Sequence, residues 1–171
     1  QTSVYIGTLG GGFFAGLTGQ LDQVDLAISG AGSPTTPLTV QIRDGSATAP
    51  GTAVLATTSV PTSAVTGNES WVPITFNSPA SVTAGTQYSI VALTDSVASW
   101  FWYAGQGATP DSAYVGGRLY FSPDGPPAMG TWSGGSPADF EFKTYVAPPT
   151  PPVVQPPTAA PTGQRAAALK K

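Results

Sequence analysis

The sequence contains no histidine and no cysteine, and only 15 of its 171 residues carry a formal charge. Histidine is the one side chain whose unperturbed pKa lies near neutrality, and cysteine supplies the thiolate nucleophile and the soft metal ligand. Nucleophilic triads of the Ser-His-Asp or Cys-His type are therefore excluded, and so are zinc sites built on these residues.

Positive charge is scarce as well. Residues 1–146 hold all nine acidic residues and three basic ones (Arg43, Arg118 and Lys143), a net charge of 3 − 9 = −6. Neutralising phosphates requires a basic face, so we expect no nucleic-acid partner. No run of 18 apolar residues occurs, and the sequence therefore predicts no transmembrane span.

Glycine and proline are abundant, with 21 and 18 residues, and 40% of the chain is apolar. This composition disfavours long helices but allows a buried core built from short elements and tight turns. The length fits one folded domain with an appended segment.

Alternating apolar residues predict β-strands. Leu38, Val40 and Ile42 alternate with polar neighbours, and residues 71–76 and 139–145 repeat the pattern. Pro73 cannot donate a ladder hydrogen bond, which predicts an edge strand or a bulge. The segment 88–93 is apolar on both faces, which is typical of a central strand.

Two irregular places are also predicted. Within residues 21–28, Leu21 is out of phase with the later apolar residues, so we expect a bulge near Asp22 and Gln23. The run Gly10-Gly11-Gly12 lacks the signature of a phosphate-binding loop and is expected to form a flexible hairpin turn. In total, nine or ten short strands predict an all-β fold, an antiparallel two-sheet β-sandwich of jelly-roll type over residues 1–146. An immunoglobulin-like sandwich is the alternative.

The composition changes after Val146. Residues 147–162 form a proline-rich run, predicted to be a polyproline-II linker about 50 Å long at roughly 3.1 Å per residue. Residues 163–171 begin a basic Ala/Lys tail, expected to be truncated or disordered. This tail is predicted to engage anionic envelope polymers weakly by charge, the alternative being a solvated terminus. Because Gln1 stands almost inside a strand-like run, we expect a mature chain or a fragment.

Aromatic residues give the strongest functional signal. Eight of the 17 aromatics lie between residues 100 and 132, and alternation places Trp100 and Trp102 on one strand face, with Phe101 and Tyr103 on the other. One pair should join the core, while the other faces outward, where ring rows can stack on sugars. The candidate ligand-binding residues are Trp100, Trp102, Tyr103, Tyr114, Arg118, Tyr120 and Trp132. The alternative is that the loop 104–117 buries these rings.

Carboxylates suggest two further kinds of site. A pair of them can hydrolyse glycosides, and Asp139 and Glu141 share a strand face beside Lys143, although a solvated face explains this equally simply. Calcium is the one cofactor considered, because it takes oxygen ligands, although no EF-hand spacing occurs. Its weak candidate ligands are Asp22, Asp25, Asp111 and Asp124.

Several segments together resemble a jelly-roll module of secreted actinobacterial proteins, the choice-of-anchor domains. They are FFAGLTGQLDQVDL (13–26), LTVQIRDG (38–45), PGTAVLA (50–56), VTAGTQYSIV (82–91) and DFEFKTY (139–145). The resemblance spans residues 13–146 and implies a surface protein of jelly-roll fold. It supplies no catalytic residues.

The low charge and the Thr/Ser/Gly/Pro bias favour a secreted or cell-surface location. We therefore predict a non-catalytic extracellular module for adhesion, display or glycan binding, with a polysaccharide or cell-envelope polymer, or other surface protein modules, as partners. A purely structural spacer without a small ligand is one alternative. A glycoside hydrolase that uses two carboxylates is the other.

Overall fold

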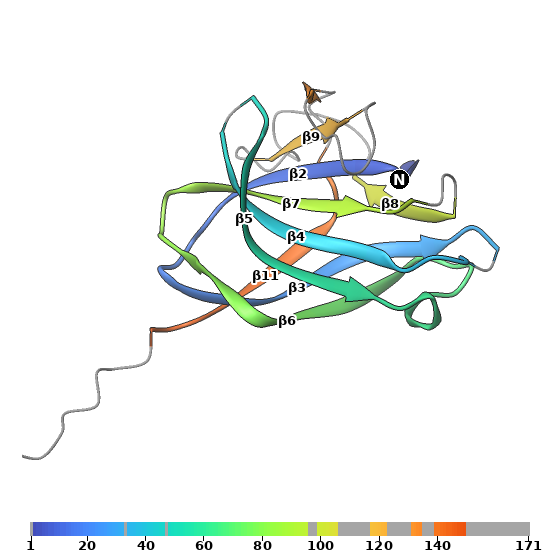
Figure 1. Cartoon of the computed structure of the whole chain (residues 1–171), viewed down its shortest axis with the longest axis horizontal. Helices are drawn as coiled ribbons and strands as arrows, with labels where there is room; N and C mark the ends of the chain where they lie inside the picture. Colours follow the sequence, from blue (N-terminus) through green and yellow to red (C-terminus); the bar gives the residue numbers. More distant parts are fainter. Residues whose placement is uncertain are drawn as a thin grey trace, which may run out of the picture.

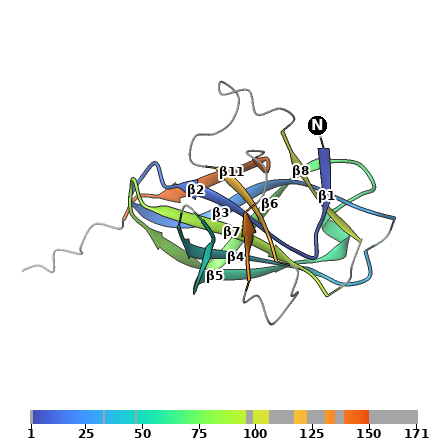
Figure 2. The same ribbon diagram turned by 90° about the horizontal axis from the view of Figure 1, so that it is seen from above.

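A computed structural model describes residues 2–32, 34–46, 48–95, 99–105, 117–122, 131–134 and 139–149. Eleven strands and one short 3-10 helix, η1 (Thr62–Ala64), lie within these ranges. Most of the proline-rich linker, the whole basic tail, Tyr114, Asp111 and Asp124 lie outside them. The strands form two antiparallel sheets that stack as the layers of a β-sandwich (Figures 1 and 2), which confirms the predicted all-β class.

The first sheet is centred on the long strand β3 (Gly19–Gly30). One side of β3 pairs with β6 (Ser70–Val82), while its other side pairs with β11 (Phe142–Ala147) over one half and with β8 (Trp100–Ala104) over the other. The edge strand β1 (Thr2–Tyr5) pairs with β8.

The second sheet has six strands in the order β10-β9-β2-β7-β4-β5. Their bounds are Ser133–Gly134 for β10, Arg118–Phe121 for β9, Thr8–Phe14 for β2, Gln87–Leu93 for β7, Leu38–Gly45 for β4 and Pro50–Val60 for β5. Figure 1 shows β2, β7, β4 and β5 side by side, with β9 beyond β2.

The pairing of the first eight strands follows one rule: β1 pairs with β8, β2 with β7, β3 with β6 and β4 with β5. These are the contacts of one long antiparallel hairpin with its tip between β4 and β5. The additional pairs β3·β8 and β4·β7 appear when that hairpin is rolled into two sheets. This is the jelly-roll arrangement, in which eight strands form two layers.

Four details of the strand predictions are confirmed. Pro73 lies in β6, which pairs only with β3 among the described strands. The register of β3 against β6 shifts between Leu21 and Gln23, where the bulge was expected. Strand β7 lies between β2 and β4, and both its faces are buried. The alternating residues of β4 and β6 point into the core.

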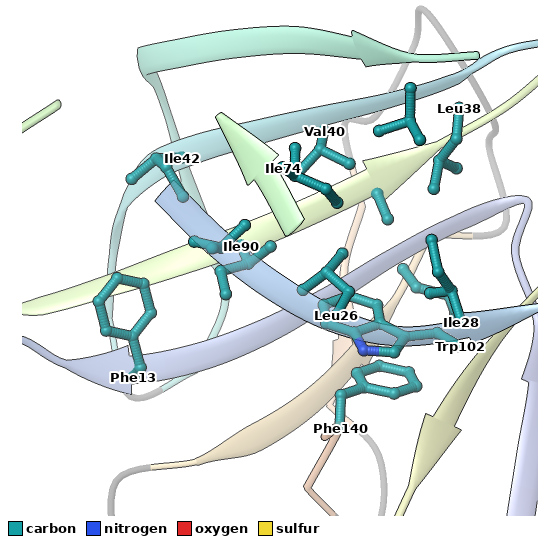
Figure 3. Close-up of a cluster of buried hydrophobic side chains, with 14 of the residues drawn as sticks. Phe13, Leu26, Ile28, Leu38, Val40, Ile42, Ile74, Ile90, Trp102 and Phe140 are labelled. Carbon is teal, nitrogen blue, oxygen red and sulfur yellow. The ribbon is translucent and has the colours of Figure 1, made fainter. Parts of the chain in front are cut away.

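The core fills the space between the sheets with aliphatic and aromatic side chains from both (Figure 3). Its largest members, Trp100 and Trp102, have no exposed surface. The rings of Trp102 and Phe140 stack with centroids 4.2 Å apart and an interplanar angle of 11°. Burying side chains of this size contributes most of the favourable free energy of folding.

The expectation of a hairpin turn at Gly10-Gly11-Gly12 is wrong, because all three residues lie inside β2. The physical reason is packing against both faces of this strand, closest on the outer face at Gly10. A Cβ atom on Gly10 would stand 2.9 Å from Cγ of Pro50 and 3.4 Å from the Trp132 ring, and one on Gly11 would stand 3.5 Å from the Trp102 ring. The glycines keep the strand thin, so that large rings can cover it from either side.

No helix of the described residues is long and apolar enough to cross a membrane.

Candidate functional site

The proposed ligand row between residues 100 and 132 is not an open surface. Trp100 and Trp102 are completely buried, and their indole nitrogens donate to the backbone carbonyls of Thr36 (2.9 Å) and Glu141 (3.1 Å). The prediction that these two rings could stack on a ligand is therefore wrong. Alternation predicted that one of the two aromatic pairs joins the core, and the structure shows that it is the Trp pair.

Three of the other predicted residues, Arg118, Tyr120 and Trp132, lie together on the outer face of the second sheet, whereas Tyr103 lies on the first sheet. Tyr103 is half-buried on β8, with its hydroxyl 3.0 Å from Oγ of Ser29. Arg118 is exposed on β9, whereas Tyr120 of the same strand is completely buried. Trp132 is half-buried against Gly10.

Around Gly10 and Tyr120 the outer face of the second sheet is covered by the protein itself. The segment between β4 and β5 lies over it, where the Tyr120 hydroxyl donates to the carbonyl of Ser46 (3.2 Å). Burial raises the pKa of the Tyr120 hydroxyl above its ordinary value, against an opposing effect of Arg118. Arg43, almost completely buried, donates to Oε1 of Gln41 (2.9 Å) and to the carbonyl of Gly51 (3.4 Å), and this burial lowers the pKa of its guanidinium. These contacts use the polar groups that a ligand would need.

An open cavity lies elsewhere, beside β11. It has a volume of about 430 Å³, within the range of small-molecule sites. We call it the aromatic groove, and it is lined by Phe13, Phe14, Trp71, Asp139, Phe140, Glu141, Phe142, Lys143 and Thr144. The lining residues come from the end of β2, the start of β6, and β11 with the residues just before it.

Trp71 supplies the exposed ring of this groove. It is 43% exposed, because alternation along β6 turns Val72 and Ile74 into the core and Trp71 outward. Its register partner on β3, Ala27, has a single methyl group, which leaves room for a side chain from β11 to reach the indole. Nζ of Lys143 lies 4.1 Å from the centre of the Trp71 ring, a cation–π contact.

The backbone of Glu141 is fixed by three hydrogen bonds. Its N–H donates to the carbonyl of Tyr103 (2.8 Å), and its own carbonyl accepts from Ala27 N–H (3.1 Å) and from Nε1 of Trp102 (3.1 Å). The buried Trp102 thereby acts as a positioning residue for a wall of the groove. This arrangement holds the Glu141 side chain on a rigid segment.

A polar network borders the groove on the outer face of the first sheet. Asp25 accepts a hydrogen bond from the Tyr145 hydroxyl (2.7 Å) and another from Nε2 of Gln23 (2.8 Å). The bond to Asp25 raises the pKa of Tyr145, because the neutral hydroxyl is the donor. Asp25 also faces Lys143 in the β3–β11 register. Together these groups offer ordered donors and acceptors next to an exposed ring.

The calcium candidates are not brought together in the described part of the chain, which contains no group of three or more acidic side chains able to hold a metal. Asp25 is engaged with Tyr145 and Gln23, and Asp22 precedes Gln23 at the bulge of β3. Asp111 and Asp124 lie outside the described residues, so calcium stays a prediction.

Trp71 and Phe14 were not among the predicted site residues, and Glu141 was predicted either to pair with Asp139 in catalysis or to belong with Lys143 to a solvated face. A signal for the groove existed, since Trp71 lies on the polar side of an edge strand and the acids and lysine of residues 139–143 share one face. What the sequence did not reveal is that β3 joins β6 and β11, bringing Trp71 and Lys143 to one place.

The fold and this groove together define a jelly-roll β-sandwich with an aromatic cavity lined by residues of both sheets. Comparison of the chain with protein families, with curated proteins and with solved structures found no match. The resemblance to choice-of-anchor domains therefore stays a prediction.

Proposed function

We propose that this chain is a non-catalytic extracellular module that binds glycan at the cell surface through the aromatic groove. The observation that carries the proposal is the exposed Trp71 ring, which lies in a cavity of about 430 Å³ beside Glu141 and Lys143. Aromatic rings bind the apolar faces of sugars, while nearby polar groups hold their hydroxyls.

The bordering network supports the same proposal. Gln23 and Tyr145 are both hydrogen-bonded to Asp25, so these side chains would lose little conformational entropy when they meet a ligand. All three project from strands rather than loops, which favours a rigid site. The partner we propose is a polysaccharide or cell-envelope polymer, and the low charge of the chain is the reason for a secreted or cell-surface location.

A hydrolase is less well supported by the groove. Asp139 and Glu141, just before β11, both line it, and Cα atoms two residues apart in an extended chain lie about 7 Å apart, comparable with the carboxyl separations of glycosidases. However, both carboxylate oxygens of Asp139 are buried, with its carboxylate packed against Gly117. A glycosidase needs both carboxylates open to the substrate.

A glycan array probed with the full chain tests the proposal, alongside the variants Trp71→Ala and Trp132→Ala. We expect binding to at least one polysaccharide class and its loss in Trp71→Ala, because the stacking ring is removed. Trp132→Ala is the matched control and should retain binding.

Two results would contradict the proposal. Binding that survives in Trp71→Ala and disappears in Trp132→Ala would return the site to residues 100–132. No binding to any glycan would favour the structural spacer.

A further inference from the structure

The Trp71 ring already holds a cation. Nζ of Lys143 lies 4.1 Å from the ring centre, well within the distance of about 6 Å at which an ammonium is attracted to an aromatic face. Lys143 projects from β11 and Trp71 from β6, and these strands are held apart by β3. The fold thus brings an ammonium from a separate strand onto this indole.

Acidic groups surround this cation site. Glu141 lines the same groove and Asp25 faces Lys143 in the β-ladder, whereas the carboxylate of Asp139, another lining residue, is buried against Gly117. Residues 1–146 carry a net charge of −6 as a whole (nine acids against three bases). A negative field of this kind concentrates positively charged ligands and repels negatively charged ones.

We propose that the aromatic groove prefers glycans that carry free amino groups. The ammonium of an amino sugar takes the place of Lys143 Nζ over the Trp71 ring, and Glu141 balances its charge, while the sugar ring lies against the indole and Phe14. This inference rests on the proposed function and names the ligand class of the same groove. Glu141 and the neighbouring Asp25 oppose a uronic-acid polymer, for which Lys143 is the one counter-charge among the residues lining the groove.

The test compares two glycans that share one backbone and differ in the charge on their amino groups. Oligomers of glucosamine and of N-acetylglucosamine, of equal length, differ only in whether the amine is free. Each is titrated into the full chain in mildly acidic buffer, where free amines are protonated, and binding is measured by calorimetry. We expect the free-amine oligomer to bind about three- to fivefold more tightly, the factor that one exposed cation–π contact gives.

Variants of Lys143 and Glu141 test whether affinity for the free-amine oligomer changes in the expected direction. Lys143→Met keeps the length of the side chain but removes the competing ammonium, so binding of the free-amine oligomer should tighten about threefold. Glu141→Gln should weaken binding of that oligomer and leave the acetylated one unchanged. Thermal unfolding of each variant confirms that the fold is retained, since Lys143 is an exposed residue.

The outcomes separate this inference from the function on which it rests. Equal or tighter binding of the acetylated oligomer, or weaker binding of the free-amine oligomer to Lys143→Met, would overturn the amino-sugar preference and leave glycan binding intact. Oligolysine that competes as well as the free-amine glycan would also overturn it, because the groove would then recognise cations on a peptide. No binding of any glycan on the array would remove the proposed function as well.

Discussion

The outer faces of the two sheets differ although both carry tryptophan. On the second sheet, Trp132 and Tyr120 cover Gly10 and Gly12, and the segment around Ser46 lies over them. On the first sheet, Trp71 stays 43% exposed, with the Lys143 ammonium over its ring. The number of aromatic residues in a segment is therefore a poor guide to a binding surface. What matters is whether the rest of the chain already covers the rings.

Removing a core ring should have the largest effect on stability. Trp102→Ala leaves a cavity beside Phe140 and breaks the indole hydrogen bond to Glu141, and we expect it to lower the free energy of unfolding by about 3–5 kcal/mol. Trp71→Ala, at a partly exposed position, should cost clearly less, about 1 kcal/mol, mainly the lost cation–π contact with Lys143. Urea unfolding measures both. Equal losses would mean that the two tryptophans do not differ in role.

Adding one methyl group on either face of β2 should have a smaller effect. Gly10→Ala places a Cβ 2.9 Å from Cγ of Pro50, so Pro50 must shift. We expect the free energy of unfolding to fall by about 1–3 kcal/mol. Gly11→Ala is the matched control, because its Cβ meets the Trp102 ring at an ordinary 3.5 Å and should cost less than about 0.5 kcal/mol. If thermal or urea unfolding showed a larger loss for Gly11→Ala, Pro50 over the outer face would adjust more easily than the Trp102 ring in the core.

The smallest expected effect comes from a single hydroxyl. Tyr120→Phe removes the bond to the Ser46 carbonyl and should lower the free energy of unfolding by about 0.5–1.5 kcal/mol near neutral pH. The folded-state pKa of Tyr120 is raised above the ordinary 10.0, so its neutral form is the one the fold stabilises.

This stabilisation is fully present below pH 10.0 and is lost as the pH rises through the folded-state pKa. Unfolding measured across alkaline pH should therefore show a decline that is weaker in Tyr120→Phe. An identical decline of the free energy of unfolding in both proteins would contradict the burial of the Tyr120 hydroxyl beneath the segment around Ser46.

The fold could be predicted from the sequence because its signals are local. Alternation in residues 38–43 and 71–76, the proline at position 73 and the phase break after Leu21 each report how a short segment pairs or packs. The glycine run was misjudged, because local propensity describes Gly10–Gly12 as a turn, whereas rings distant in sequence require a thin strand there.

The candidate site could not be predicted in the same way. Its composition depends on β3 pairing with β6 on one side and with β11 on the other, which joins residue 71 to residue 143. Alternation correctly predicted that Trp100 and Trp102 share a face, but it could not decide which face the core covers. These rings are buried because the second sheet packs against them, and no local pattern in the sequence predicts that packing.

The four tryptophans allow one direct measurement of the central claim, that the open face of the first sheet binds glycan through Trp71. Each indole N–H gives its own signal in a proton–nitrogen correlation spectrum of the full chain. During titration with a glycan that the array identifies, the signal of Trp71 should move, while those of Trp100 and Trp102, hydrogen-bonded within the core, should stay in place. Movement of the Trp132 signal with that of Trp71 unchanged would contradict the account.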